Sequence, residues 1–123
     1  MMDKKITEAE WKIMRILWNH APITLKEIIK ELKREINWSN TTVRTLVVRL
    51  MEKEFIGADK TAANFKYYPL IDKGECQVKE AKNLINTVFE GSMEMLITAF
   101  DKKGKLSGKE LEELKRIIDK IEE

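Results

Sequence analysis

The chain has 123 residues, a length that suits one domain or one small domain with an appendage. Charged residues make up 36% and apolar residues 43%, as in ordinary globular proteins, and the net charge is +2. A single cysteine, Cys76, excludes an internal disulfide and a zinc or iron–sulfur site made of several cysteines of one chain. With one histidine, His20, and no glycine-rich phosphate loop, the sequence predicts no enzyme, no metal site and no cofactor.

The charge is unevenly distributed along the chain. Residues 1–71 hold 13 Lys/Arg against 9 Asp/Glu, and residues 72–123 hold 10 against 12, so the net charges are +4 and −2. A basic first part is typical of a module that binds a polyanion. The opening residues contain no apolar run of a secretory signal, and no stretch approaches the roughly 18 apolar residues of a membrane span. We therefore expect a cytoplasmic protein.

The first predicted helix covers about residues 8–19 and follows a capping box, Thr7-Glu-Ala-Glu10. Its expected core face consists of Ala9, Ile13, Ile16 and Leu17. Trp11, Met14 and Trp18 form a second apolar stripe, about 100–160° around the helix. We expect this stripe to pack beneath the protein's own later helices, although a ligand is the alternative.

Two further helices and a hairpin follow. Pro22 allows only a stub of strand, and a second capping box, Thr24 with Glu27, opens a helix over about residues 25–34. Ser39 is the expected N-cap of a third helix that reaches about Lys53. Residues 55–58 and 65–71 predict two strands joined by a turn at 59–64. Three helices followed by such a hairpin predict a winged helix-turn-helix over residues 1–71.

Residues 72–123 return to helical periodicity, interrupted at Gly91-Ser92 and again near Gly104, with a third capping box from Ser107 to Glu110. Three short helices bury little surface alone, so they either fold back on the first domain or pair with a second chain. We favour pairing, which makes residues 72–123 a helical dimerisation domain. The residues expected at this interface are large and apolar: Leu84, Val88, Met93, Leu96, Ile97, Phe100, Leu114 and Ile118.

The third helix carries an unusual outward face. Its apolar residues Val43, Leu46, Val47 and Leu50 define one buried stripe. The opposite face carries short side chains with hydroxyl and methyl groups. Such side chains can approach base edges and thymine methyls in a major groove. They are Thr41, Thr42, Thr45 and Val48, with Asn40 at the N-terminal end.

Basic residues surround that face. Arg44 and Arg49 flank it and are expected to contact phosphates, although either can reach a guanine instead. The free N–H groups near Ser39 and the hairpin lysines, Lys60 and Lys66, are further candidates for backbone contacts. A protein-interaction module is the alternative class, and weak, salt-insensitive DNA binding by a monomer would favour it.

Several segments in succession resemble the BlaI/MecI penicillinase-repressor family, which includes copper-responsive CopY repressors: ITEAEWKIMRILW, PITLKEIIKEL, WSNTTVRTLVVRLMEKEFI, KYYPLI, KNLINTVFEGS and LSGKELEELKRII. The resemblance implies a homodimeric winged-helix repressor that binds a palindromic operator with TACA/TGTA-type half-sites. It places Thr41, Thr42 and Thr45 at positions that face bases, and Arg44 and Arg49 near the DNA backbone. Relatives often have Ser-Pro-Lys where this chain has Ser39-Asn40-Thr41, so one lysine is missing.

The resemblance also suggests how repression ends. The copper-responsive branch carries a C-terminal cysteine cluster, which this chain lacks beyond Cys76. The β-lactam branch is cleaved in its dimerisation domain at an Asn-Phe bond, and the matching position here is Ala99-Phe100. A membrane sensor protease, or its effector, is the implied partner. The alternative is that Phe100 is simply a core residue of the dimer.

Overall fold

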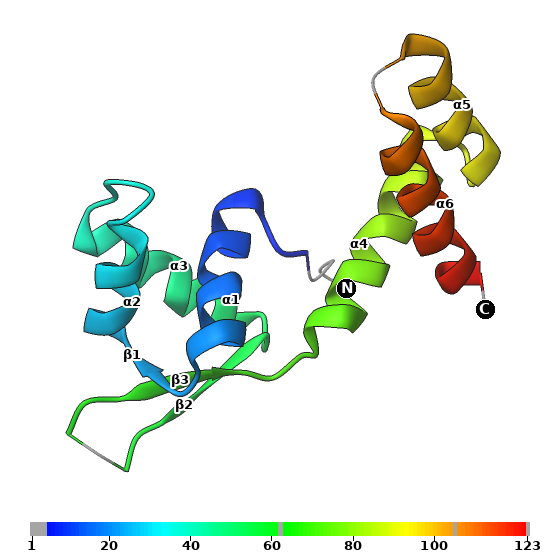
Figure 1. The fold of residues 1–123 in the computed structure, drawn as a ribbon. Coiled ribbons are helices and arrows are strands. Elements are labelled where there is room, and N and C mark those ends of the chain that lie inside the picture. Colours follow the sequence, from blue (N-terminus) through cyan, green and yellow to red (C-terminus); the bar gives the residue numbers. More distant parts are fainter. Residues whose placement is uncertain (1–4, 62, 105, 123) are drawn as a thin grey trace. The chain divides into compact units, whose positions relative to one another are not determined.

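The computed structural model describes residues 5–61, 63–104 and 106–122. This part of the chain contains six helices and a small antiparallel sheet of three strands, so the fold is mainly helical, as predicted (Figure 1). The chain divides into two compact units, Met1–Lys73 and Gly74–Glu123. No helix in the described part is long and apolar enough to cross a membrane.

The first unit has the element order of a winged helix. Its helices are α1 (Glu8–His20), α2 (Leu25–Leu32) and α3 (Asn40–Glu52), and its strands are β1 (Ile23–Thr24), β2 (Ile56–Asp59) and β3 (Lys66–Pro69). The strand order is β1-β3-β2, which places the hairpin's second strand in the centre. Figure 1 shows the hairpin of β2 and β3 extending beyond the three helices as a wing.

The helix starts follow the predicted caps. Thr7 and Thr24 each accept a hydrogen bond from the backbone N–H three residues later, and the glutamate there accepts one in return. Ser107 and Glu110 make the same pair of bonds. Each box satisfies backbone donors that a helix leaves unpaired at its first turn.

Two boundaries were predicted too late, and one of them is the end of the second wing strand, which lies at Pro69 rather than at residue 71. The second helix ends at Leu32 rather than near Arg34, because the chain tightens into a turn there. The N–H of Lys33 is shared between the carbonyls of Ile29 and Glu31, which is the bifurcated bonding of a helix end.

A hydrophobic core joins the three helices to the sheet. Burying each large side chain stabilises the fold by about 1.5–3 kcal/mol. The buried apolar residues of the first unit are Ile6, Ile13, Met14, Leu17, Ile23, Ile28, Leu32, Val43, Leu46, Val47, Leu50, Phe55 and Ile56. The predicted core positions Ala9 and Ile16 are only partly buried, whereas Glu10, which the apolar pattern did not include, is completely buried.

The second apolar stripe of α1 packs within the first unit, where α1 lies against α2, α3 and β3. Met14 is fully buried, and the rings of Trp11 and Trp18 lie 5.6 Å apart at 54°. The indole Nε1 of Trp18 donates a hydrogen bond of 3.0 Å to the carbonyl oxygen of Ile71. This bond ties the segment after β3 to α1.

The second unit contains α4 (Lys73–Val88), α5 (Met93–Lys103) and α6 (Gly108–Glu122). Ser92 caps α5, and Gly104 ends it with a positive φ of 59°, a conformation that glycine adopts without strain. One buried residue from each helix forms the core: Ile85, Leu96 and Ile118.

Candidate nucleic-acid interface

Helix α3 is held so that one face is buried and the other is open. Ser39 has extended backbone angles, and its Oγ accepts a hydrogen bond of 3.1 Å from the N–H of Thr42, as the sequence predicted. Val43, Leu46, Val47 and Leu50 are buried. Because these positions recur every three or four residues, the remaining positions form a continuous exposed surface.

Thr41, Thr45 and Val48 lie at the centre of that exposed surface. The Oγ1 of Thr45 donates to the carbonyl of Thr41 at 2.9 Å, which uses the hydroxyl proton and leaves the oxygen able to accept a further hydrogen bond. In the described part of the chain, the Thr41 hydroxyl makes no hydrogen bond that would hold it. The Thr42 hydroxyl differs, because it lies 2.9 Å from the Ser39 hydroxyl within the cap.

The two arginines lie at opposite edges of this surface. At 100° per residue, Arg44 and Asn40 fall on one side of the threonines and Arg49 on the other. Both arginine side chains are exposed. Arg44 borders two hollows, one toward the wing and one toward α2.

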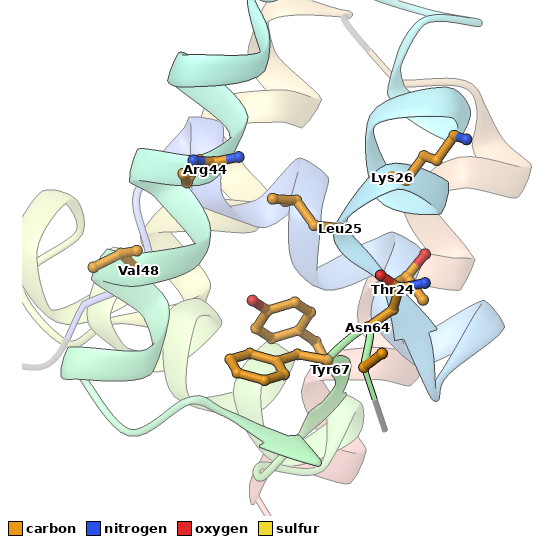
Figure 2. Close-up of a pocket in the computed structure, with 9 residues that line it drawn as sticks. Thr24, Leu25, Lys26, Arg44, Val48, Asn64 and Tyr67 are labelled. Atoms are coloured by element: carbon orange, nitrogen blue, oxygen red, sulfur yellow. The ribbon is translucent and has the colours of Figure 1, made fainter. Parts of the chain in front are cut away.

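The first hollow has a volume of about 530 Å³ and lies between the start of α2, α3 and the wing (Figure 2). Figure 2 shows Tyr67 between Val48 on α3 and Thr24 on the opposite side. Apolar groups of Leu25, Val48 and Phe65 contribute to its walls.

Both lysines predicted on the wing have exposed side chains. Lys60 lies over the Phe65 ring, with Nζ 5.6 Å from the ring centroid. Lys66 pairs across the hairpin with Asp59. The Asp59 carboxylate accepts hydrogen bonds from the hydroxyl and N–H of Thr61, and these bonds, with a smaller contribution from Lys66, lower the pKa of Asp59.

The second hollow, of about 540 Å³, adds basic residues that the sequence analysis did not single out. It lies between α2 and α3 and contains Lys26, Lys30 and Lys33 together with Asn40 and Arg44. The i, i+4, i+7 spacing of the three lysines was the available signal, because it places them along one side of a helix.

The residues predicted for dimerisation separate into two groups. Five lie in or against the second unit's own core: Met93, Leu96, Ile97, Leu114 and Ile118. Three are exposed by 36% or more: Leu84, Val88 and Phe100. Exposed Ile117 also belongs to α6, where it borders an apolar groove with Val78 and Ala81 of α4.

The candidate cleavage position lies inside a helix. Ala99 and Phe100 are both exposed, and they occupy the middle of α5. In the described residues, no three His, Cys, Asp or Glu side chains are grouped as metal ligands. Cys76 is buried and forms no disulfide.

Comparisons with known proteins agree with this geometry. The profile of the penicillinase repressor family matches residues 6–120. The methicillin resistance regulatory protein MecI of Staphylococcus aureus is 38% identical over 122 residues, covering 97% of this chain and 99% of MecI. A penicillinase repressor of Bacillus licheniformis is 30% identical over 115 residues, covering 94% and 90% of the two chains.

Two solved structures share the fold of the first unit. The DNA-binding domain of the repressor BlaI superimposes with a TM-score of 0.54 at 34% identity, covering 61% of this chain and 93% of that domain. Monomeric Bacillus licheniformis BlaI in complex with the blaP half-operator gives 0.52 at 35% identity, covering 58% and 87%. The chain therefore belongs to the penicillinase repressor (BlaI/MecI) family of DNA-binding transcriptional repressors.

Proposed function

We propose that this protein is a cytoplasmic homodimer that represses transcription by placing α3 of each copy in the major groove of a palindromic operator. The observation that carries the proposal is the exposed face of α3. Its centre is formed by Thr41, Thr45 and Val48, and an arginine lies at each edge. Short hydroxyl and methyl side chains allow close approach to base edges, while arginines at the rim reach phosphates.

The three threonines have different roles in this proposal. Thr41 and Thr45 present a hydroxyl and a methyl group outward and read bases, together with Asn40. Thr42 contributes mainly through the Ser39 cap, where its N–H and hydroxyl are engaged. The backbone contacts come from Ser39, Arg44, Arg49, Lys60 and Lys66.

Two observations support the proposal of binding as a pair. A monomeric relative, BlaI of Bacillus licheniformis, is known in complex with a half-operator, so two copies are the natural match to a full operator. The second unit also leaves Leu84, Val88, Met95 and Ile117 exposed by 45% or more, and a second copy could cover this apolar surface.

Base reading is tested by replacing Thr45 with Phe and selecting bound sites from random DNA. The bulky ring blocks close approach, so we expect operator preference to disappear while binding to non-specific DNA and the urea midpoint of unfolding remain. Retention of the same preferred site by Thr45→Phe would refute the assignment of this face. Arg49→Ala should weaken all DNA sequences about equally, with Arg15→Ala on α1 as the matched control.

Dimerisation is tested on exposed residues, because a charge in the unit's own core would simply unfold it. Val88→Glu should give a monomer by light scattering and lose tight binding to the full operator. Asn83→Glu introduces the same charge about 120° from the midpoint of Leu84 and Val88 and should remain dimeric. If the Val88→Glu variant is still a dimer, the dimer interface does not include Val88 and lies elsewhere on the protein.

Derepression by cleavage between Ala99 and Phe100 is the proposed regulatory step, carried out by a membrane sensor protease or its effector. Because the bond lies within α5, cleavage requires this helix to unwind locally. Mass spectrometry of the protein recovered from β-lactam-treated cells should detect a fragment that ends at Ala99. Derepression with only intact protein would contradict this step.

A further inference from the structure

Three lysines form a row along one side of α2 and its C-cap residue, Lys33. Lys26, Lys30 and Lys33 lie within an arc of about 60°, at 100° per residue. The row is about 10 Å long, at 1.5 Å per residue. All three side chains are exposed, and all three border the hollow between α2 and α3. The apolar residues Leu25 and Ile29 form part of the same hollow.

The lysines of this row are available for an external partner. None of them takes part in an ion pair in the described part of the chain, in contrast to Lys53 and Arg34. The acidic residues of α2 are engaged mainly with other groups: hydrogen bonds from Thr24 chiefly lower the pKa of Glu27, and Lys66 and Lys30 contribute least. Glu27 is held by the Thr24 cap, and Glu31 lies 3.6 Å from Arg34 and 4.0 Å from His20.

The row continues the candidate DNA interface rather than forming a separate site. Lys26 and Arg44 border both hollows, so positive charge extends from the wing across α3 to the end of α2. Asn40, at the start of α3, faces the same hollow as Lys30 and Lys33. DNA that holds α3 in its major groove would therefore pass beside this row of lysines.

We infer that Lys26, Lys30 and Lys33 form a second phosphate-binding edge, which contacts the DNA backbone on the α2 side of α3. This inference rests on the proposed function. Lysine is a flexible point charge and makes no sequence-specific contact with phosphate, so the edge adds affinity and salt dependence without adding base specificity. Phosphates on one strand are spaced about 3.4 Å along the duplex axis, so a row of this length contacts more than one of them.

The test compares two double variants of the full chain on a duplex that carries one half-site. Lys30→Gln/Lys33→Gln removes two charges from the row. Arg15→Gln/Arg34→Gln removes the same net charge from α1 and from the turn after α2. Binding is measured by fluorescence anisotropy at salt concentrations between 50 and 200 mM, on the selected half-site and on a scrambled duplex.

The row variant should lower the slope of log affinity against log salt by about 1.8 per bound protomer, since each phosphate contact contributes about 0.9. As the salt concentration rises from 50 to 200 mM, the affinity of the row variant should therefore fall by a factor that is about ten times smaller than the factor for the wild type. The preferred half-site should not change, and the control variant should retain nearly the wild-type slope.

The outcomes separate the inference from the proposed function. If the wild type shows a steep salt slope and both double variants keep that slope equally, the phosphate-binding edge is overturned. The assignment of α3 as the DNA-binding helix would still stand. Lack of half-site preference in the wild-type protein would overturn the proposed function itself. An unchanged slope together with row-dependent binding to polyglutamate would assign the lysines to an acidic protein partner and overturn the inference.

Discussion

The buried ion pair between Glu10 and Lys53 links α1 to the end of α3, and Lys53→Met is expected to destabilise the first unit. The Lys53 Nζ lies 2.7 Å from the Glu10 Oε1 and also donates to the carbonyl of Lys5 at 2.9 Å. The side chain of Glu10 is 1% exposed and that of Lys53 is 26% exposed. Removing the lysine leaves a buried carboxylate whose Oε1 retains only the N–H of Thr7.

The expected loss follows from that burial. Breaking a buried pair by removing one partner costs about 3–5 kcal/mol. Solvent reaches part of Lys53, so we expect a loss of about 2–3 kcal/mol here. Replacing both partners with neutral groups of similar shape, in Glu10→Gln/Lys53→Met, removes the stranded charge and should recover more than half of this loss.

The stability difference should also depend on pH. Burial raises the pKa of Glu10, but hydrogen bonds from Lys53 and Thr7 together outweigh it and hold the pKa below its ordinary value of 4.5. A lowered folded-state pKa contributes stability that is present above 4.5 and is lost as the pH falls through the folded-state value. In Lys53→Met the pKa of Glu10 is higher than in the wild type, so the stability gap between wild type and variant should narrow as the pH falls through the range in which Glu10 is protonated in the variant but not in the wild type.

Urea unfolding followed by tryptophan fluorescence measures this effect, because Trp11, Trp18 and Trp38 all belong to the first unit. With a slope of about 1–3 kcal/mol per molar urea, the midpoint of Lys53→Met should fall by about 0.7–3 M at pH 7. A midpoint equal to that of the wild type would refute the reasoning. So would a double variant no more stable than Lys53→Met.

Three further changes test local contacts by the same unfolding assay. Ser39→Ala removes the α3 cap and should cost about 1 kcal/mol, and an unchanged midpoint would mean that the cap contributes nothing. Gly57→Ala places a Cβ 2.8 Å from the Tyr68 ring, so the ring must move. Because Tyr68 is 38% exposed, its ring can swing outward, so we expect a shifted Tyr68 NMR signal and a loss of at most about 0.5 kcal/mol, and an unshifted signal would contradict the clash. Trp18→Phe removes the bond to the Ile71 carbonyl and should cost about 1 kcal/mol, whereas full stability would show that water replaces the indole donor.

The local rules of helix formation were sufficient to predict most of the first unit. Capping boxes and Ser39 identified helix starts within a residue, because the cap side chains bond to backbone groups only three positions away. The aromatic and β-branched content of residues 55–58 and 65–71 located the wing. The end of α2 was less predictable, since termination there depends on a turn that carries no Gly or Pro.

Features that depend on distant parts of the chain were not predictable in the same way. Glu10 looked like a routine capping residue, and only Lys53, 43 positions away, explains why its side chain is buried. The dimerisation residues formed one apolar set in the sequence. Periodicity cannot separate an apolar side chain that packs within its own unit, such as Leu96, from one that remains exposed, such as Val88.

Support at both ends of α3 lies outside its exposed face. Ser39 fixes the first turn, and Lys53, the C-terminal cap, connects the last turn to Glu10 on α1. The hydrogen bond of Thr45 closes within the helix and needs no partner on another element. Residues of the exposed face therefore contribute little to stability, and substitutions there can change which operator is bound without unfolding the domain. Substitutions at Ser39, Glu10 or Lys53 should have the opposite effect, lowering stability while preserving the choice of bases.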